Sequence, residues 1–121
     1  MAEIGNPKQF DLEDRTREFA KRIRGFVKRL PKSIANHEDS RQLIRSSGSV
    51  AANYIEANES LSKKDFAMRI KISREEAKES RLWLGLLDCG QDVSVENECK
   101  ALAKESTELM LIFGSILKKS I

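Results

Sequence analysis

The side chains best placed for chemistry in this sequence are cations, and they are concentrated near the N-terminus. The segment from residue 15 to residue 32 holds eight basic residues and one acid, Glu18, so its formal charge is +7, whereas the whole chain sums to +3 at pH 7. The basic residues are Arg15, Arg17, Lys21, Arg22, Arg24, Lys28, Arg29 and Lys32. Because clustered guanidinium and ammonium groups can neutralise phosphates, these eight are the candidate nucleic-acid-binding residues.

This basic segment has two interpretations that the sequence leaves open. On a helix, Arg15, Arg22 and Arg29 share one row beside an outer face of further cations, and the stripe is about 20 Å long. It suits sequence-tolerant binding of RNA or DNA, because no exposed aromatic residues are interleaved with it to stack bases. The alternative is a passive charged face on a protein-interaction scaffold that binds no nucleic acid. A membrane partner is not expected, because the apolar face of this helix is needed for a core.

Few residues are suited to enzymatic chemistry. The single histidine, His37, lacks the partners that a catalytic triad or a di-iron site requires. Four glutamates could gather around a hard cation: Glu56, Glu75, Glu76 and Glu79. Helical glutamates more often form solvated faces or salt bridges, however, and the two cysteines, Cys89 and Cys99, match no metal-ligand spacing. We therefore expect a protein that is not an enzyme, with no cofactor and no metal.

The elements that position these side chains follow from apolar periodicity. Four segments repeat apolar residues in alternating steps of three and four, which predicts helices over about residues 11–30, 37–59, 62–89 and 94–119. Pro31 should stop the first helix, Ser62 should cap the third and Gly90 should end it. Since short connections force neighbouring helices to run antiparallel, the predicted fold is all-α, an antiparallel up-down-up-down four-helix bundle forming one domain over residues 1–121.

The third expected helix carries a second seam about 200° from its core-facing one. This second seam is apolar at both ends and acidic in the middle: Met68, Ile72, Glu75, Glu79, Leu82 and Leu86. A monomer needs only one seam, so we expect self-association through this face. On the second helix, Asn53 and Glu56 stand beside the apolar seam, where they are predicted to bond across to the third helix or to a neighbouring chain.

No targeting or membrane segment is apparent. No apolar run approaches the roughly 18 residues of a membrane span, and the N-terminus lacks the apolar core of a signal peptide. We expect a soluble, cytoplasmic protein whose cysteines are free thiols.

Small residues from Ser46 to Ala52 indicate close helix packing, since Ser-Ser-Gly-Ser lacks the spacing of a phosphate-binding loop. They belong to a longer series of motifs: Arg45-Ser46, Ser49-Val50-Ala51-Ala52-Asn53, Glu56-Ala57, Asp65-Phe66, and Glu76-Ala77-Lys78-Glu79 with Trp83-Leu84. Through these motifs the chain resembles the four-helix bundle proteins encoded by intervening sequences of bacterial 23S rRNA genes. The resemblance covers nearly the whole chain.

The resemblance implies a fold and an assembly but no chemistry. Similar proteins form closed five-membered rings of bundles and have no established biochemical activity, so the implied partner is the chain itself, as a pentamer. Related bundles include the accessory variability determinant of diversity-generating retroelements, a basic pentamer that binds nucleic acid and its partner reverse transcriptase. That relationship implies RNA or DNA as a further partner here.

Overall fold

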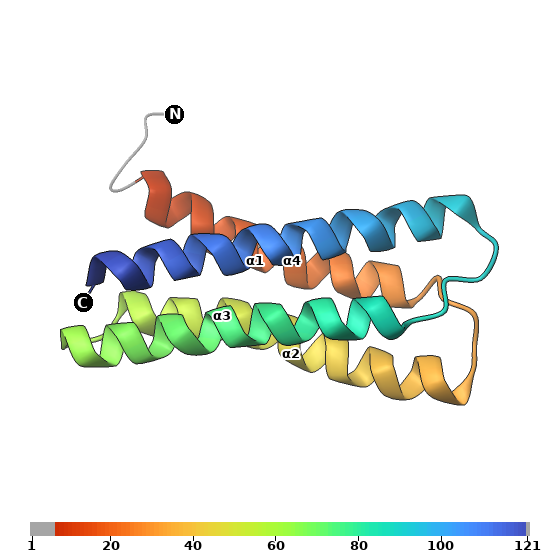
Figure 1. The fold of residues 1–121 in the computed structure, drawn as a ribbon, viewed down its shortest axis with the longest axis horizontal. Helices are drawn as coiled ribbons and strands as arrows, with labels where there is room; N and C mark the ends of the chain where they lie inside the picture. Colours follow the sequence, from red (N-terminus) through yellow and green to blue (C-terminus); the bar gives the residue numbers. More distant parts are fainter. Residues whose placement is uncertain (1–6, 121) are drawn as a thin grey trace.

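The computed structural model of this chain describes residues 7–120, with side chains described from Leu12 onward. Four helices account for most of it: α1 (Pro7–Val27), α2 (Ile34–Asn58), α3 (Lys63–Leu86) and α4 (Val93–Ser120). Figure 1 shows the helices side by side and alternating in direction, with α1 next to α2 and α4, and α3 next to α2 and α4. The predicted all-α four-helix bundle is confirmed, and the described residues contain no strand.

The core is formed by the seams that the periodicity predicted. Large apolar side chains from all four helices are at most 1% exposed: Phe19, Ile23, Phe26, Leu43, Val50, Ile70, Leu84, Leu102, Leu109 and Phe113. Removing one such side chain from water stabilises a fold by about 1.5–3 kcal/mol. The rings of Tyr54 and Phe113 also meet at a centroid distance of 5.9 Å, which joins α2 to α4 across the bundle.

Small side chains allow α2 and α3 to pack closely, and these two helices share the most extensive contact in the bundle. Ser46 of α2 and Ser80 of α3 are fully buried, and their hydroxyl oxygens lie 2.8 Å apart. The buried hydroxyl of Ser73 donates to the carbonyl oxygen of Val50 at 3.1 Å. These bonds satisfy polar groups that burial would otherwise leave without a partner.

Two serines set the starts of helices. The hydroxyl of Ser62 accepts a hydrogen bond from the Asp65 amide at 3.0 Å, which confirms the predicted cap, and α3 begins at Lys63. Ser33 caps α2 in the same way through the Asn36 amide, also at 3.0 Å. This second cap was not predicted, and it explains why α2 begins at Ile34 rather than at residue 37.

Two helices end earlier than predicted. α1 stops at Val27, and the chain continues to Leu30 in a turn whose amides bond to carbonyls three residues back, because Pro31 disfavours helical geometry in the residue before it. α3 stops at Leu86 rather than near residue 89, since Leu87 is already extended with ψ 143°.

Gly90 therefore lies in the loop after α3 and does not end the helix. Its φ is +72°, a left-handed conformation that glycine adopts without steric cost. A Cβ atom at this position would lie 2.8 Å from Cγ of Pro31 in the loop between α1 and α2. The absence of a side chain thus lets the two loops at this end of the bundle touch.

Asn36 joins the same two loops by hydrogen bonds. Its side chain is only 4% exposed. Its amide nitrogen donates to the carbonyl oxygens of Pro31 and Asp88, both at 2.9 Å, and its Oδ1 accepts from the Asp88 amide at 3.0 Å. One buried amide therefore holds the start of α2 against the chain that leaves α3.

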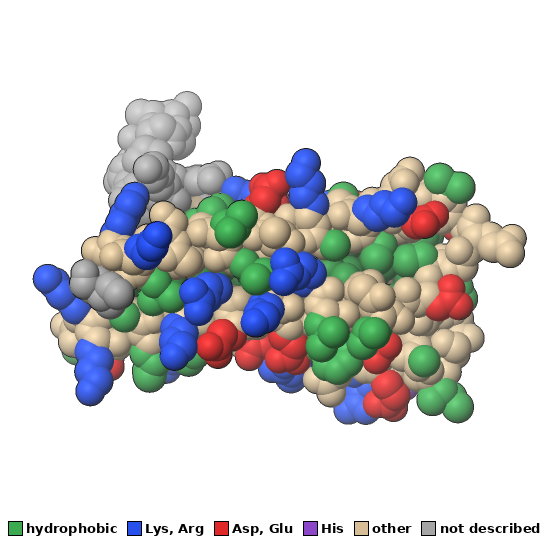
Figure 2. All heavy atoms as spheres, in the orientation of Figure 1, with side chains coloured by type: hydrophobic (Ala, Val, Ile, Leu, Met, Phe, Trp, Pro, Cys, Tyr) green, Lys and Arg blue, Asp and Glu red, His purple; other side chains and the backbone are tan. Residues whose placement is uncertain are grey.

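On the face of the bundle shown in Figure 2, basic, acidic and apolar side chains lie next to one another. A few large apolar side chains are also exposed: Ile34, Leu61, Met68, Leu82, Leu86, Val93 and Leu111. None of the helices within residues 7–120 combines the length and the hydrophobicity that crossing a bilayer requires.

Replacing Asn36 with alanine should destabilise the bundle. The substitution removes three hydrogen bonds to backbone groups of Pro31 and Asp88, which costs about 1–3 kcal/mol in the free energy of unfolding. Urea unfolding followed by circular dichroism measures this loss, with Asn97→Ala, an exposed site on α4, as the matched control. Equal unfolding midpoints for the two variants would contradict the role assigned to Asn36.

Candidate nucleic-acid interface

The basic residues of the N-terminal segment fall into two groups that face different partners. The first group faces α4. Nε of Arg15 donates to Glu105 at 2.7 Å, and its Nη2 donates to Glu108 at 2.6 Å. Arg22 forms two parallel bonds to Glu98, both at 3.1 Å. Paired N–H donors on a carboxylate fix the orientation of both side chains and are stronger than neutral hydrogen bonds.

Antiparallel packing brings these charges together. Glu105 and Glu98 are seven residues apart on α4, which matches the spacing of Arg15 and Arg22 on α1. One step further along, the Arg29 guanidinium donates to the Ser94 hydroxyl. The row that sequence analysis placed in a nucleic-acid-binding stripe thus forms a ladder between two helices.

The acidic side of this ladder was not predicted from the sequence. A signal was present, because acids at seven-residue spacing stand beside the α4 seam in the first half of that helix. Recognising it requires knowing that this face of α4 meets α1.

The ion pairs also explain the titration behaviour of the arginines. The hydrogen bond from Arg15 to Glu105 raises the pKa of Arg15 above its ordinary value, and the bond from Arg22 to Glu98 does the same for the pKa of Arg22. The side chains of Arg15 and Arg22 are 30% and 35% exposed. Their charges are therefore paired with α4 carboxylates while the side chains stay partly exposed.

The second group faces solvent and consists of Arg17, Lys21, Arg24, Lys28 and Lys32, which we call the outer cation face. Arg17 pairs with Asp14 at 3.1 Å, but both side chains are more than half exposed, so this surface pair adds at most about 1 kcal/mol. Within the described part of the chain, Lys21, Lys28 and Lys32 form no salt bridge. Of the eight predicted residues, these five remain accessible to a partner, as does Arg29, which is exposed where it bonds to Ser94.

The Arg24 side chain extends from α1 toward α2. Its Nη1 donates to the carbonyl oxygen of Ala20 at 2.9 Å. Its Nη2 lies over Gly48 of α2, where a Cβ atom would be 3.4 Å from that nitrogen. Gly48 therefore leaves room for the guanidinium group to lie close to α2 while remaining exposed.

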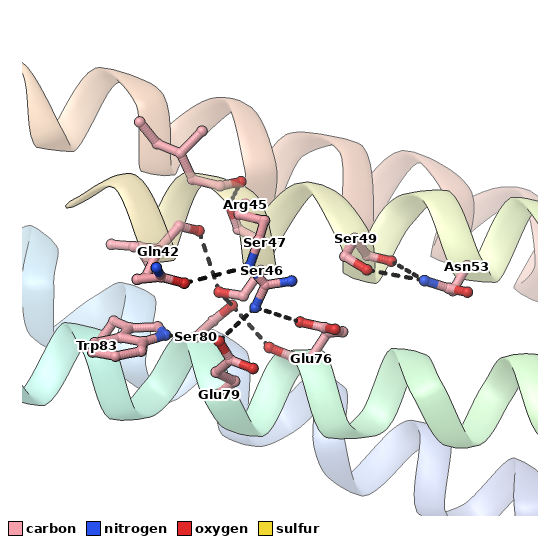
Figure 3. Close-up of polar contacts among 12 residues, drawn as sticks. Gln42, Arg45, Ser46, Ser47, Ser49, Asn53, Glu76, Glu79, Ser80 and Trp83 are labelled. Carbon is pink, nitrogen blue, oxygen red and sulfur yellow. Dashed lines mark hydrogen bonds and ion pairs between the residues drawn. The ribbon is translucent and has the colours of Figure 1, made fainter. Parts of the chain in front are cut away.

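A polar cluster joins α2 to α3 on another side of the bundle (Figure 3). Arg45 of α2 forms salt bridges with Glu79 and Glu76 of α3, and the Trp83 indole donates to Glu79 Oε2 at 3.0 Å. Oε1 of Glu76 is buried and accepts no hydrogen bond within the described residues, but it lies 3.4 Å from Nη2 of Arg45. These residues belong to the motifs that carried the resemblance.

Asn53 and Glu56, the two residues predicted to bond between helices, differ in their contacts. Oδ1 of Asn53 accepts a hydrogen bond from Arg69 of α3 at 2.9 Å. Its amide nitrogen donates to the carbonyl oxygen and the hydroxyl of Ser49, both at 3.0 Å (Figure 3). Glu56 is exposed one turn further along α2.

The second seam of α3 lies on the surface. Met68, Leu82 and Leu86 are 50%, 53% and 56% exposed. Of the remaining seam residues, Glu75 is exposed, whereas Ile72 and Glu79 are half-buried. Apolar side chains on both sides of an acidic centre therefore face outward, and their predicted role in self-association stays a prediction.

The residues best suited to metal or nucleophilic chemistry are dispersed. Across residues 7–120, no three side chains of His, Cys, Asp or Glu are grouped so as to hold a metal ion. His37 is exposed near the start of α2. Burial, together with the nearby Cys89 thiol, raises the pKa of Cys99 to about 12, so this thiol stays protonated at neutral pH.

Comparison with known families matches residues 8–114 to the 23S rRNA-intervening sequence protein family. The chain belongs to this family. Its fold is similar to that of a crystallised protein of unknown function from the S23 ribosomal protein family of Bacteroides thetaiotaomicron, with a TM-score of 0.72 and 31% sequence identity. That alignment covers 88% of this chain and 97% of the other. No curated protein matches the sequence.

Replacing Arg15 should lower the free energy of unfolding more than replacing Lys21, which belongs to the outer cation face. Arg15→Ala leaves the half-buried Glu105 without its cation, and we expect a loss of about 1–2 kcal/mol, since hydrogen bonds to charged groups contribute more than neutral ones even where solvent screens them partly. Lys21→Ala is the matched control and should change stability by less than about 0.5 kcal/mol. Urea denaturation measures both, and equal losses would contradict the division of the basic residues into two groups.

The Glu79 carboxylate should make stability depend on acid pH. The hydrogen bond from Trp83, followed by that from Arg45, lowers the pKa of Glu79 from 4.5. Its stabilising contribution is therefore complete above pH 4.5 and is lost as the pH falls through the lower folded-state pKa.

Glu79→Gln removes this titration. The stability difference between wild type and Glu79→Gln should shrink as the pH is lowered from 7 to 3 in a series of urea unfolding curves. Glu59→Gln, at an exposed site, is the control. A constant difference between wild type and Glu79→Gln over this range would show that the carboxylate is not stabilised as described.

Proposed function

We propose that this member of the 23S rRNA-intervening sequence protein family is a non-enzymatic, cytoplasmic homo-oligomer that binds RNA or DNA without sequence preference through its outer cation face. The observation that carries this proposal is the second group of basic residues, which remain exposed after Arg15 and Arg22 have paired with α4. Lysine and arginine side chains in such a row attract phosphates whatever the base sequence.

The proposed self-association would strengthen nucleic-acid binding. One outer cation face offers few phosphate contacts, and the affinity of a single copy is correspondingly low. Self-association through the second seam of α3 places several such faces on one particle, so that binding at one raises the effective concentration of phosphates at the next. A closed pentamer, as the resemblance to ring-forming bundles suggests, would bring five faces together.

A scaffold that binds only proteins is the second candidate. It is favoured by the exposed apolar side chains of Met68, Leu82 and Leu86, which offer surface to a protein rather than to a phosphate backbone. The two candidates differ in one respect that can be measured, namely whether the outer cation face binds nucleic acid.

Charge reversal of the outer cation face tests the proposal. In Lys21→Glu/Arg24→Glu/Lys28→Glu the ladder to α4 is untouched, so the fold should survive while binding of a fluorescein-labelled single-stranded RNA collapses. The slope of log affinity against log salt should fall in magnitude by about 2, because each lost phosphate contact removes about 0.7. Fluorescence anisotropy across a salt series measures both quantities.

The matched control has the same change in net charge at other exposed sites. Lys63→Glu/Lys64→Glu/Lys104→Glu should retain most of the affinity and most of the salt slope. Equal losses in both triple variants would show that net charge alone governs binding. Absence of binding by the wild type at low salt would reject the proposal in favour of the protein scaffold.

A further inference from the structure

A recess of about 470 Å³ lies on the surface where α1 passes into α2. No carboxylate of the described residues lines it. Its polar lining includes two lysines, two serines and the single histidine: Lys28, Lys32, Ser33, Ser40 and His37. Lys28 and Lys32 also belong to the outer cation face, so the recess is continuous with the proposed nucleic-acid interface.

These five side chains can all donate hydrogen bonds to an anion. An ammonium group has three donors, a hydroxyl has one, and an imidazole has at least one in either protonation state. The Ser33 hydroxyl accepts a bond from the Asn36 amide at 3.0 Å, which leaves its own hydrogen to donate. Lys28 and Lys32 form no salt bridge with any residue that the structure describes. The recess therefore combines net positive charge with several donors in a small space.

The chain around the recess is held in place without a ligand. The Asn36 side chain donates to the carbonyl oxygens of Pro31 and Asp88, both at 2.9 Å. Gly90 lies against the Pro31 ring, and the Leu30 side chain packs into the core with 8% of its surface exposed. A preformed recess binds its ligand with little loss of conformational entropy, which favours affinity.

We propose that this recess binds the terminal phosphomonoester of a nucleic-acid strand, while the nucleotides that follow lie along Lys21, Arg24 and Lys28. This inference rests on the proposed function and adds which part of the strand the bundle selects. A phosphomonoester carries a charge of about −1.5 to −2 at pH 7 and three acceptor oxygens. An internal phosphodiester carries a single negative charge, so it gains less from donors gathered at one point.

The apolar side of the recess suits a terminal nucleotide rather than a free phosphate ion. Val27, Leu30 and Pro31 line this side, and Pro31 is exposed. The ribose and base of the terminal nucleotide can pack on this surface whatever the sequence, because every base has a π face. Inorganic phosphate has no group that could use it.

Two other recesses are less suited to a phosphate, because carboxylates line them. Asp14, Glu18 and Glu105 line the recess between α1 and α4, and Glu75 lines the groove between α3 and α4. Like charge at a binding site opposes the approach of an anion. The recess at the α1–α2 loop is free of this repulsion and adjoins the outer cation face.

The chemistry of the RNA end tests the recess. Single-stranded RNA with a 5′-phosphate or a 3′-phosphate is compared with hydroxyl-ended RNA by fluorescence anisotropy, each labelled with fluorescein at the opposite end. One phosphorylated RNA should bind at least about fivefold more tightly, because hydrogen bonds to charged groups are strong. The RNA that gains affinity shows which end the recess takes. Hydroxyl-ended RNA two nucleotides longer has about the same added charge and should gain less than about twofold.

Variants of the lining residues assign this gain to the recess. The readout is the ratio of affinities for phosphate-ended and hydroxyl-ended RNA, in which general changes to binding cancel. His37→Ala/Ser40→Ala and Lys32→Gln should each lower this ratio by at least about half, because each removes donors from the recess. Lys63→Gln is the matched control. This lysine lines a recess at the opposite end of the bundle, and its replacement should leave the ratio at the wild-type value (Figure 1).

A free nucleotide distinguishes a strand end from a small ligand. Uridine monophosphate can fill the recess but cannot reach along the outer cation face, so it should bind at least about tenfold more weakly than phosphate-ended RNA. Isothermal titration calorimetry measures both affinities. Equal affinities would assign the recess to a small phosphate compound and overturn its role as a site for strand ends.

The remaining outcomes separate this inference from the proposed function. Equal affinity of the wild type for phosphate-ended and hydroxyl-ended RNA, or an unchanged ratio in the recess variants, would overturn the recess and leave the outer cation face intact. Binding of phosphate-ended RNA alone would support the recess and reject the outer cation face as an interface on its own. Absence of binding by every RNA would reject both.

Discussion

Ion pairs between α1 and α4 determine which charges of this bundle are available to a partner. The N-terminal segment carries a formal charge of +7, but Arg15 and Arg22 direct theirs into carboxylates of α4. The pairs hold α1 against α4, and the buried apolar seam of α1 sets the orientation of the helix. With that orientation set, the outer cation face points to solvent, and no side chain of the core is needed for binding.

Unlike the ion-paired contact between α1 and α4, the contact between α2 and α3 is built from small side chains and buried hydroxyls. The buried contact between Ser46 and Ser80 and the bonds of Arg45 to the α3 glutamates define the orientation of α3 against α2. The second seam is therefore held outward. The bundle thus separates its two proposed roles, with phosphates bound at α1 and further copies bound at the second seam of α3.

Local sequence patterns predicted what depends on local structure. Apolar periodicity identified the four helices and their buried seams, and the Ser62 cap was evident from the residues that follow it. The ladder to α4 and the hydrogen bonds between Asn36 and Asp88 could not be predicted, because they join residues more than 50 positions apart and depend on which helix faces meet. The sequence placed Arg15, Arg22 and Arg29 on one row beside an outer face of further cations, but only the packing of α1 against α4 shows that Arg15 and Arg22 are paired with carboxylates.

Lysine footprinting tests most directly whether RNA binds to the outer cation face. The protein would be acetylated at limiting reagent with and without single-stranded RNA, and the modification of each lysine would be quantified by mass spectrometry. The account predicts protection of Lys21, Lys28 and Lys32 by RNA, with the exposed Lys63, Lys64 and Lys104 unaffected. Equal protection at all six sites, or protection restricted to the second set, would contradict an interface on the outer cation face.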